Sequence, residues 1–158
     1  MPESIHQSQK ATRPKIEDVA GNFLSAENNA TLQDFVKFLR AGKIGVGWAS
    51  GNSWSLRYKG KLFGSLHIHN GMWRFAHRGI EKYYQMDDGD LKTFIFDNIY
   101  ARNCGNCQWD PGSPKAGYMQ PTGCGCWPLR IFNAGGEVLE NTKKLVEFRM
   151  KCILEDIK

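Results

Sequence analysis

The sequence predicts an α+β domain whose antiparallel sheet is covered on one face by two to three helices. Three segments space their apolar residues three or four positions apart, as one face of a helix does. A central segment alternates apolar and polar residues with a period of two, which is typical of strands. Helices that stand apart from a run of antiparallel strands are characteristic of the α+β class, so a single domain over residues 15–158 is expected.

Three helices are expected. The first covers residues 31–43, with Thr31 as its cap and an apolar face formed by Leu32, Phe35, Val36 and Leu39. The second covers residues 90–101 and leads directly into the cysteine-rich loop. The third covers residues 137–158, where apolar positions alternate with lysine and glutamate as on a solvated helix.

The central segment is expected to form a three-stranded antiparallel meander, with one or two further strands beside it. The three strands are divided by the two-residue turn signals Lys59-Gly60 and Asn70-Gly71. They are therefore expected at residues 53–58, 61–69 and 72–77. A short strand near 44–49 precedes the meander, and one more is expected within 127–133.

Charge and the N-terminal sequence exclude several classes of protein. Residues 1–14 are polar and aperiodic, so they are expected to form a flexible tail, and the absence of an apolar core there argues against a secretory signal. No apolar run approaches the roughly 18 residues of a membrane span. The net charge is +5, but the basic residues are scattered rather than gathered on one face. A cytoplasmic protein is expected, with neither a membrane nor a nucleic acid as its partner.

Four of the five cysteines lie in the loop 104–126, as a C-x2-C pair and a C-x-C pair. Paired thiolates on either side of a loop are common ligands of structural zinc, so a zinc site is expected at Cys104, Cys107, Cys124 and Cys126. A redox pair or a disulfide is one alternative, although an activated pair usually begins a helix, whereas Cys104 follows one. Unliganded structural cysteines are the other alternative. Cys152 lies on an apolar helix stripe and is expected to be buried.

Aromatic and histidine side chains of the meander form the candidate ligand site. If alternate residues point away from the core, they line a pocket for a small molecule or a protein; the candidates are Trp54, Tyr58, His67, His69, Trp73 and Phe75. The opposing interpretation places the aromatic residues in the core. His67 and His69 form a pair able to share a metal ion if His77 is a third ligand; otherwise the two face solvent.

Two stretches of the chain resemble small bacterial families of unknown function. Residues 52–71 are similar to a W-S-L-x-Y segment of those families, and residues 124–151 are similar to their C-terminal ending. The matching positions are Trp54, Ser55, Leu56 and Tyr58, then Cys124, Cys126, Phe132, Asn133, Leu139, Glu140, Lys143, Lys144, Leu145, Glu147 and Arg149. The resemblance implies a bacterial cytosolic protein with an intact cysteine module, and it implies no activity.

The sequence therefore favours a module that binds a small molecule or a partner, with zinc in a structural role. It contains no nucleophile elbow, phosphate-binding loop, dinucleotide fingerprint or metalloprotease motif, and it predicts no catalytic residue. The first alternative is a metal-dependent enzyme that uses the zinc or His67 and His69. The second is a nucleic-acid-binding zinc protein.

Overall fold

Five antiparallel strands form one sheet in the computed structural model, which describes residues 3–77, 82–83, 86–99 and 129–158 of the chain. The strands are β1 (Gly45–Ser50), β2 (Ser53–Tyr58), β3 (Lys61–His69), β4 (Met72–His77) and β5 (Leu129–Phe132). Their order in the sheet is their order in the chain, and every neighbouring pair is antiparallel. The predicted α+β class with an antiparallel sheet is confirmed.

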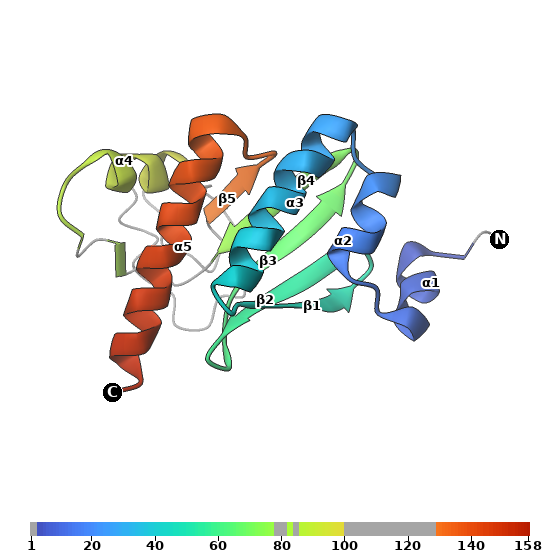
Figure 1. The fold of residues 1–158 in the computed structure, drawn as a ribbon, viewed down its shortest axis with the longest axis horizontal. Helices are drawn as coiled ribbons and strands as arrows, with labels where there is room; N and C mark the ends of the chain where they lie inside the picture. Colours follow the sequence, from blue (N-terminus) through green and yellow to red (C-terminus); the bar gives the residue numbers. More distant parts are fainter. Residues whose placement is uncertain (1–2, 78–81, 84–85, 100–128) are drawn as a thin grey trace, which may run out of the picture.

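The helices gather mainly on one face of this sheet. They are α1 (Ile5–Thr12), α2 (Ile16–Val19), the 3-10 helix η1 (Ala20–Asn22), α3 (Ala26–Ala41), α4 (Asp90–Asp97) and α5 (Gly136–Asp156). Figure 1 shows α3 and α5 side by side in front of the strands, with α2 next to α3 and α1 beyond the end of the sheet. Helix α4 packs against α5. The sheet therefore has a core face, which α3 and α5 cover, and an opposite face.

The core face carries the large apolar side chains of the strands. Phe35 of α3 packs against Trp73 and Phe75 of β4, with ring centroids 5.7 and 5.5 Å apart. The buried indole nitrogens are satisfied, since Trp54 donates to the Pro14 carbonyl at 2.9 Å and Trp73 donates to the Thr31 hydroxyl at 3.2 Å. These bonds attach the helical layer to β2 and β4.

Both hairpin turns of the meander have the geometry that their sequences predict. Lys59 and Gly60 have φ values of 48° and 77°, and Asn70 and Gly71 have values of 50° and 73°. Positive φ at both central residues matches the twist of antiparallel strands, and glycine adopts it without strain. The three central strands accordingly have the predicted bounds, 53–58, 61–69 and 72–77.

Helix α3 begins five residues before the predicted start. Ser25 is its cap and accepts a hydrogen bond from the Asn28 backbone at 3.2 Å. Thr31 lies inside the helix, where its hydroxyl donates to the Asn28 carbonyl at 3.1 Å and accepts from Trp73. The first turn is polar, so the apolar period that predicts the helix starts only after it.

The expected flexible tail, residues 1–14, contains helix α1. Ser4 and Gln7 form a capping box at its start, and Gln9 is buried with 7% exposure. Gln9 bonds to Asn52 in the turn between β1 and β2 and to Trp48 of β1. The expectation of a tail is corrected for residues 5–12, because they form a helix whose Gln9 and His6 side chains contact the sheet.

Candidate ligand-binding sites

The sequence-predicted ligand residues divide between the two faces of the sheet. Trp54, Trp73 and Phe75 have no exposed surface and Tyr58 has 8%, so these four aromatic residues belong to the core. His67 and His69 alternate with the buried Leu66 and Ile68 along β3 and therefore point to the opposite face. We call this the His67 face. The side chains of the four aromatic residues are buried on the other side, and Trp54 is the one of the four that also lines a pocket on the His67 face.

Strand register aligns polar side chains across the His67 face. Ser53, His67, Arg74 and Phe132 are successive partners on β2, β3, β4 and β5 and form one row. The neighbouring row is Ser55, Ser65, Ala76 and Arg130. Side chains that are partners on neighbouring strands lie about 5 Å apart, so Arg74 lies close to the His67 ring. Arg130 lies two strands away in the neighbouring row and lines the same hollow.

Small residues leave a hollow between these side chains. The larger part has a volume of about 420 Å³, and a second part of about 140 Å³ shares His67 and Arg74 with it. We call the two parts together the His67 hollow. Its charged lining side chains among the described residues are Arg74 and Arg130, and its apolar end consists of Met72 and Phe132.

Among the described residues, burial and the two arginines determine the protonation of His67. Burial of the His67 ring, together with the positive charges of Arg74 and Arg130, lowers its pKa to about 4. The imidazole is therefore neutral near pH 7, and Nε2 lies 2.7 Å from the Ser65 hydroxyl. A positive potential that suppresses protonation of a histidine favours a bound anion at the same place.

Ser65 and His67 are in hydrogen-bond contact, as a nucleophile and its general base are in an enzyme. His67 is nevertheless too weak a base for that role. A general base is most effective when its pKa lies near the working pH. With a pKa of about 4, His67 is a weak acceptor for the Ser65 proton at pH 7. The arrangement is better suited to binding than to nucleophilic catalysis.

The possible histidine metal site is not assembled. His67 and His69 share a face, whereas His77 is fully buried on the core face, where its ring contacts Phe75 and Tyr83. Among the described residues there is no group of three or more His, Cys, Asp or Glu side chains able to hold a metal ion. The four predicted zinc ligands, Cys104, Cys107, Cys124 and Cys126, lie outside the described residues. Cys152 is buried, as expected.

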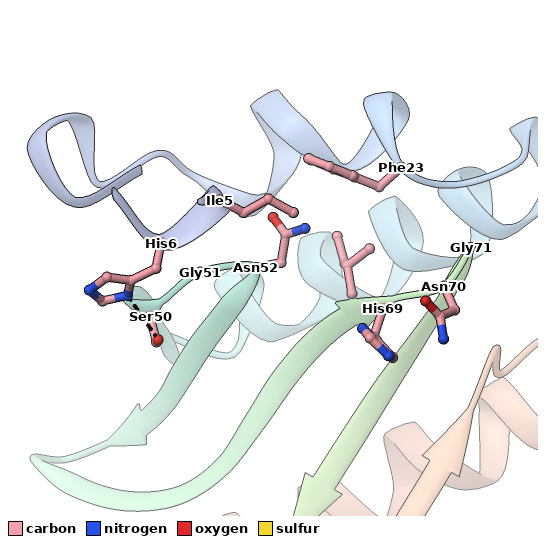
Figure 2. Close-up of a pocket in the computed structure, with 10 residues that line it drawn as sticks. Ile5, His6, Phe23, Ser50, Gly51, Asn52, His69, Asn70 and Gly71 are labelled. Carbon is pink, nitrogen blue, oxygen red and sulfur yellow. Dashed lines mark hydrogen bonds between the residues drawn. The ribbon is translucent and has the colours of Figure 1, made fainter. Parts of the chain in front are cut away.

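A second hollow lies at the end of the sheet nearest α1, and Figure 2 shows it. Its volume is about 560 Å³. Its walls come from four places: the start of α1, the end of η1, the turn between β1 and β2, and the end of β3 with its turn. We call it the Asn52 hollow; its lining residues are Ile5, His6, Phe23, Ser50, Gly51, Asn52, Ile68, His69, Asn70 and Gly71.

Arg74 and Arg130 are not among the sequence-predicted site residues. The Asn70-Gly71 turn implies that His67 pairs with Arg74, so the sequence does contain a signal for the first arginine. Arg130 joins the site only because β5 pairs with β4, and no local pattern specifies that pairing. The Asn52 hollow has no sequence signal, because α1 is not predicted.

The comparisons with known proteins add no functional information. A scan against protein-family models and searches of curated proteins and of solved structures gave no match to this chain. The resemblance to small bacterial families therefore stays a prediction. Within the described part of the chain, no helix is both long enough and apolar enough to span a membrane.

Proposed function

We propose that this protein is a binding module for a small anionic molecule, held on the His67 face between His67, Arg74 and Arg130. One observation carries the proposal: three neighbouring strands direct these three nitrogen-bearing side chains into one hollow. Hydrogen bonds from arginine to carboxylate or phosphate oxygens are charge-assisted and are stronger than neutral ones. The Ser65 hydroxyl supplies a further polar group beside them.

His67 adds proton linkage to this binding. In the free protein the charges of Arg74 and Arg130 disfavour a charged imidazole ring. An anion placed between the three side chains offsets those charges, so it raises the pKa of His67. Binding of the anion is therefore expected to strengthen as the pH falls from 7 toward the pKa that His67 has in the ligand-free protein.

Sulfate is a suitable probe because it keeps its charge over this pH range. The ¹H signals of the His67 ring, followed by NMR during a sulfate titration, should shift in a saturable way. Arg130→Gln should lower the affinity about tenfold, which corresponds to the loss of one charge-assisted hydrogen bond. The pKa of His67 should also rise in the presence of sulfate.

Arg57 provides a matched control on the same sheet. It lies on β2, is exposed, and does not line the His67 hollow. Arg57→Gln removes the same charge and should change the sulfate affinity less than about twofold, since an exposed charge that does not contact the ligand is largely screened by salt. Equal losses in the two variants would mean that sulfate responds to net charge alone and would refute the proposal. Non-saturable shifts would refute it as well.

The structural zinc site remains part of the proposal. It rests on the spacing of Cys104, Cys107, Cys124 and Cys126. In this proposal the metal has a structural role and takes no part in binding the anion. One equivalent of zinc in the purified protein, lost on the double change Cys104→Ser and Cys124→Ser, is the expected result. Metal-free protein whose stability is unchanged by a chelator would refute it. A cytoplasmic location, where thiols stay reduced, is consistent with this chemistry.

A further inference from the structure

We propose that the Asn52 hollow is a second binding site, specific for a small uncharged molecule that carries a hydrogen-bond acceptor on an apolar or aromatic frame. The proposal does not rest on the anion site, because its chemistry is different and other side chains carry it. It starts from a set of hydrogen bonds that fixes the orientation of one buried amide.

Gln9 of α1 is oriented by two groups that are only able to donate. The Trp48 indole nitrogen and the Asn52 backbone N–H reach the Gln9 Oε1 atom at 3.1 and 2.9 Å. Neither donor has an alternative role, so the acceptor must be the oxygen of the Gln9 amide. Its Nε2 group is consequently on the other side, where it donates to Asn52 Oδ1 at 2.7 Å.

The orientation of Asn52 follows from that of Gln9. Since Oδ1 accepts from Gln9, the Nδ2 group is the end of the Asn52 amide that remains for another partner. Asn52 is only 7% exposed and lines the hollow, and within the described part of the chain Nδ2 donates to no acceptor. Figure 2 shows the Asn52 amide near Ile5, with Phe23 and His69 on neighbouring walls of the hollow.

The Asn52 Nδ2 donor faces the hollow without being sealed off from it, since it is not one of the fully buried side-chain atoms that lack a partner among the described residues. A ligand that fills the hollow would seal this donor off, and leaving it without a partner would then cost free energy. Ile5, Phe23 and Ile68 supply an apolar part of the wall, beside the polar side chains of His6, Ser50, His69 and Asn70. The occupant should therefore combine a carbonyl-type or ring-nitrogen acceptor with an apolar body.

Charge and size narrow the class of occupant further. None of the described residues that line the hollow is Asp, Glu, Lys or Arg, and the titratable side chains among them are His6 and His69, so no permanent charge compensates the burial of a charged ligand. The volume of about 560 Å³ is that of an ordinary small-molecule site. These features favour an uncharged small molecule over an ion or a peptide.

Acetophenone and ethylbenzene form a matched pair of probes, since they differ mainly by a carbonyl oxygen. Acetophenone should bind about fivefold more tightly, as expected for one neutral hydrogen bond. Its binding should shift the Asn52 side-chain NH₂ signals in ¹H–¹⁵N spectra, whereas ethylbenzene should leave them nearly unmoved. Sulfate should not shift them, which separates this site from the His67 hollow.

The variant Asn52→Asp replaces the donor with an oxygen. It retains the oxygen that accepts from Gln9, and Asp tolerates the left-handed backbone at this position, where φ is 50°. In this variant the fivefold preference for acetophenone should disappear. The control is Asn133→Asp, at another left-handed asparagine (φ 44°) whose Oδ1 accepts from the Trp73 backbone at 2.8 Å. The control should keep the preference.

The proposal is overturned if the intact protein binds the two probes equally, or if acetophenone leaves the Asn52 NH₂ signals unmoved. Persistence of the preference in Asn52→Asp would overturn it too. If that variant does not fold, the NH₂ signals of the intact protein decide, because no other group in the hollow reports so directly on the proposed bond.

Discussion

The two hollows are built on the same sheet by different physical means. The His67 hollow is produced by strand register alone, which pairs His67 with Arg74 and puts Arg130 in the adjacent row on the next strand. The Asn52 hollow needs a helix from outside the sheet, because Gln9 of α1 fixes the amide that faces the ligand. One site is therefore selective through charge, and the other through a single oriented donor.

This difference implies that each hollow can be disabled without the other. The His67 hollow should persist as long as the sheet is folded. The Asn52 hollow should fail whenever α1 detaches, even if the sheet is intact. Changes in α1, in the protonation of His67 and in ionic strength test this separation, in order of decreasing effect.

Gln9→Ala should have the largest effect. It leaves the Trp48 indole N–H, the Asn52 backbone N–H and the Asn52 Oδ1 atom without their partner. We expect a loss of about 2–3 kcal/mol in the free energy of unfolding, measured in denaturant, because unsatisfied buried polar groups are costly. Acetophenone binding should be lost, whereas sulfate binding should stay within about twofold of the original affinity, as expected for a site without contact to the change.

Lys10→Ala is the control for that change, since Lys10 is the exposed neighbour of Gln9 on α1. It should alter stability by less than about 0.5 kcal/mol, as most surface changes do. If Gln9→Ala weakened sulfate binding as strongly as acetophenone binding, the two hollows would be coupled and the distinction drawn above would be wrong.

The sequence predicts the strands of the sheet better than the helices, because short turn sequences determine where the strands begin and end. The bounds of β2, β3 and β4 follow from two-residue turns whose glycines adopt positive φ, so a few neighbouring residues determine them. The local signal for helix α1 is weaker: the Ser4–Gln7 capping box marks its start, but no clear apolar period follows it. What attaches the helix is Gln9 together with His6, which contact residues about 40 positions later in the chain.

The candidate sites follow the same division. His67 is predictable as a site residue, and its pairing with Arg74 follows from the turn between β3 and β4. The position of Arg130 depends on the pairing of β5 with β4, across a connection of about 50 residues that obeys no short-range rule. The aromatic residues that the sequence offers as ligand contacts are instead buried, because Trp54, Trp73 and Phe75 form part of the core.

Acid should destabilise the protein through His67. Its pKa is about 4 in the folded protein against 6.5 in the unfolded chain, so between these values the unfolded chain binds more protons. The stability is therefore fully present above about pH 6.5 and is lost as the pH falls toward 4. We expect His67 to account for about 1–2 kcal/mol, after allowing for solvent screening of a partly exposed ring.

The comparison of the original protein with His67→Gln isolates this effect. Glu17, Asp88 and Asp156, whose pKa values are lowered by ion pairs with Arg40, Lys92 and Lys82, contribute equally in both proteins. The difference in unfolding free energy between the two should change from pH 7 to pH 4.5, as measured in urea. Parallel pH profiles would show that the His67 hollow lacks the positive potential on which anion binding depends. Sulfate should reduce the acid sensitivity of the original protein.

A change in ionic strength should have the smallest effect of the three, and it should change ligand affinity differently in the two hollows. Raising sodium chloride from about 0.05 to 0.5 M shortens the Debye length from roughly 14 to 4 Å, so the attraction of Arg74 and Arg130 for sulfate is screened. We expect sulfate affinity to fall about threefold or more, partly through competition by chloride. Acetophenone carries no charge, and salt strengthens apolar burial only slightly, so its affinity should stay constant or rise. Isothermal titration in both salts measures this. A parallel loss for both probes would mean that salt acts on the fold, and the electrostatic difference between the hollows would then have no support.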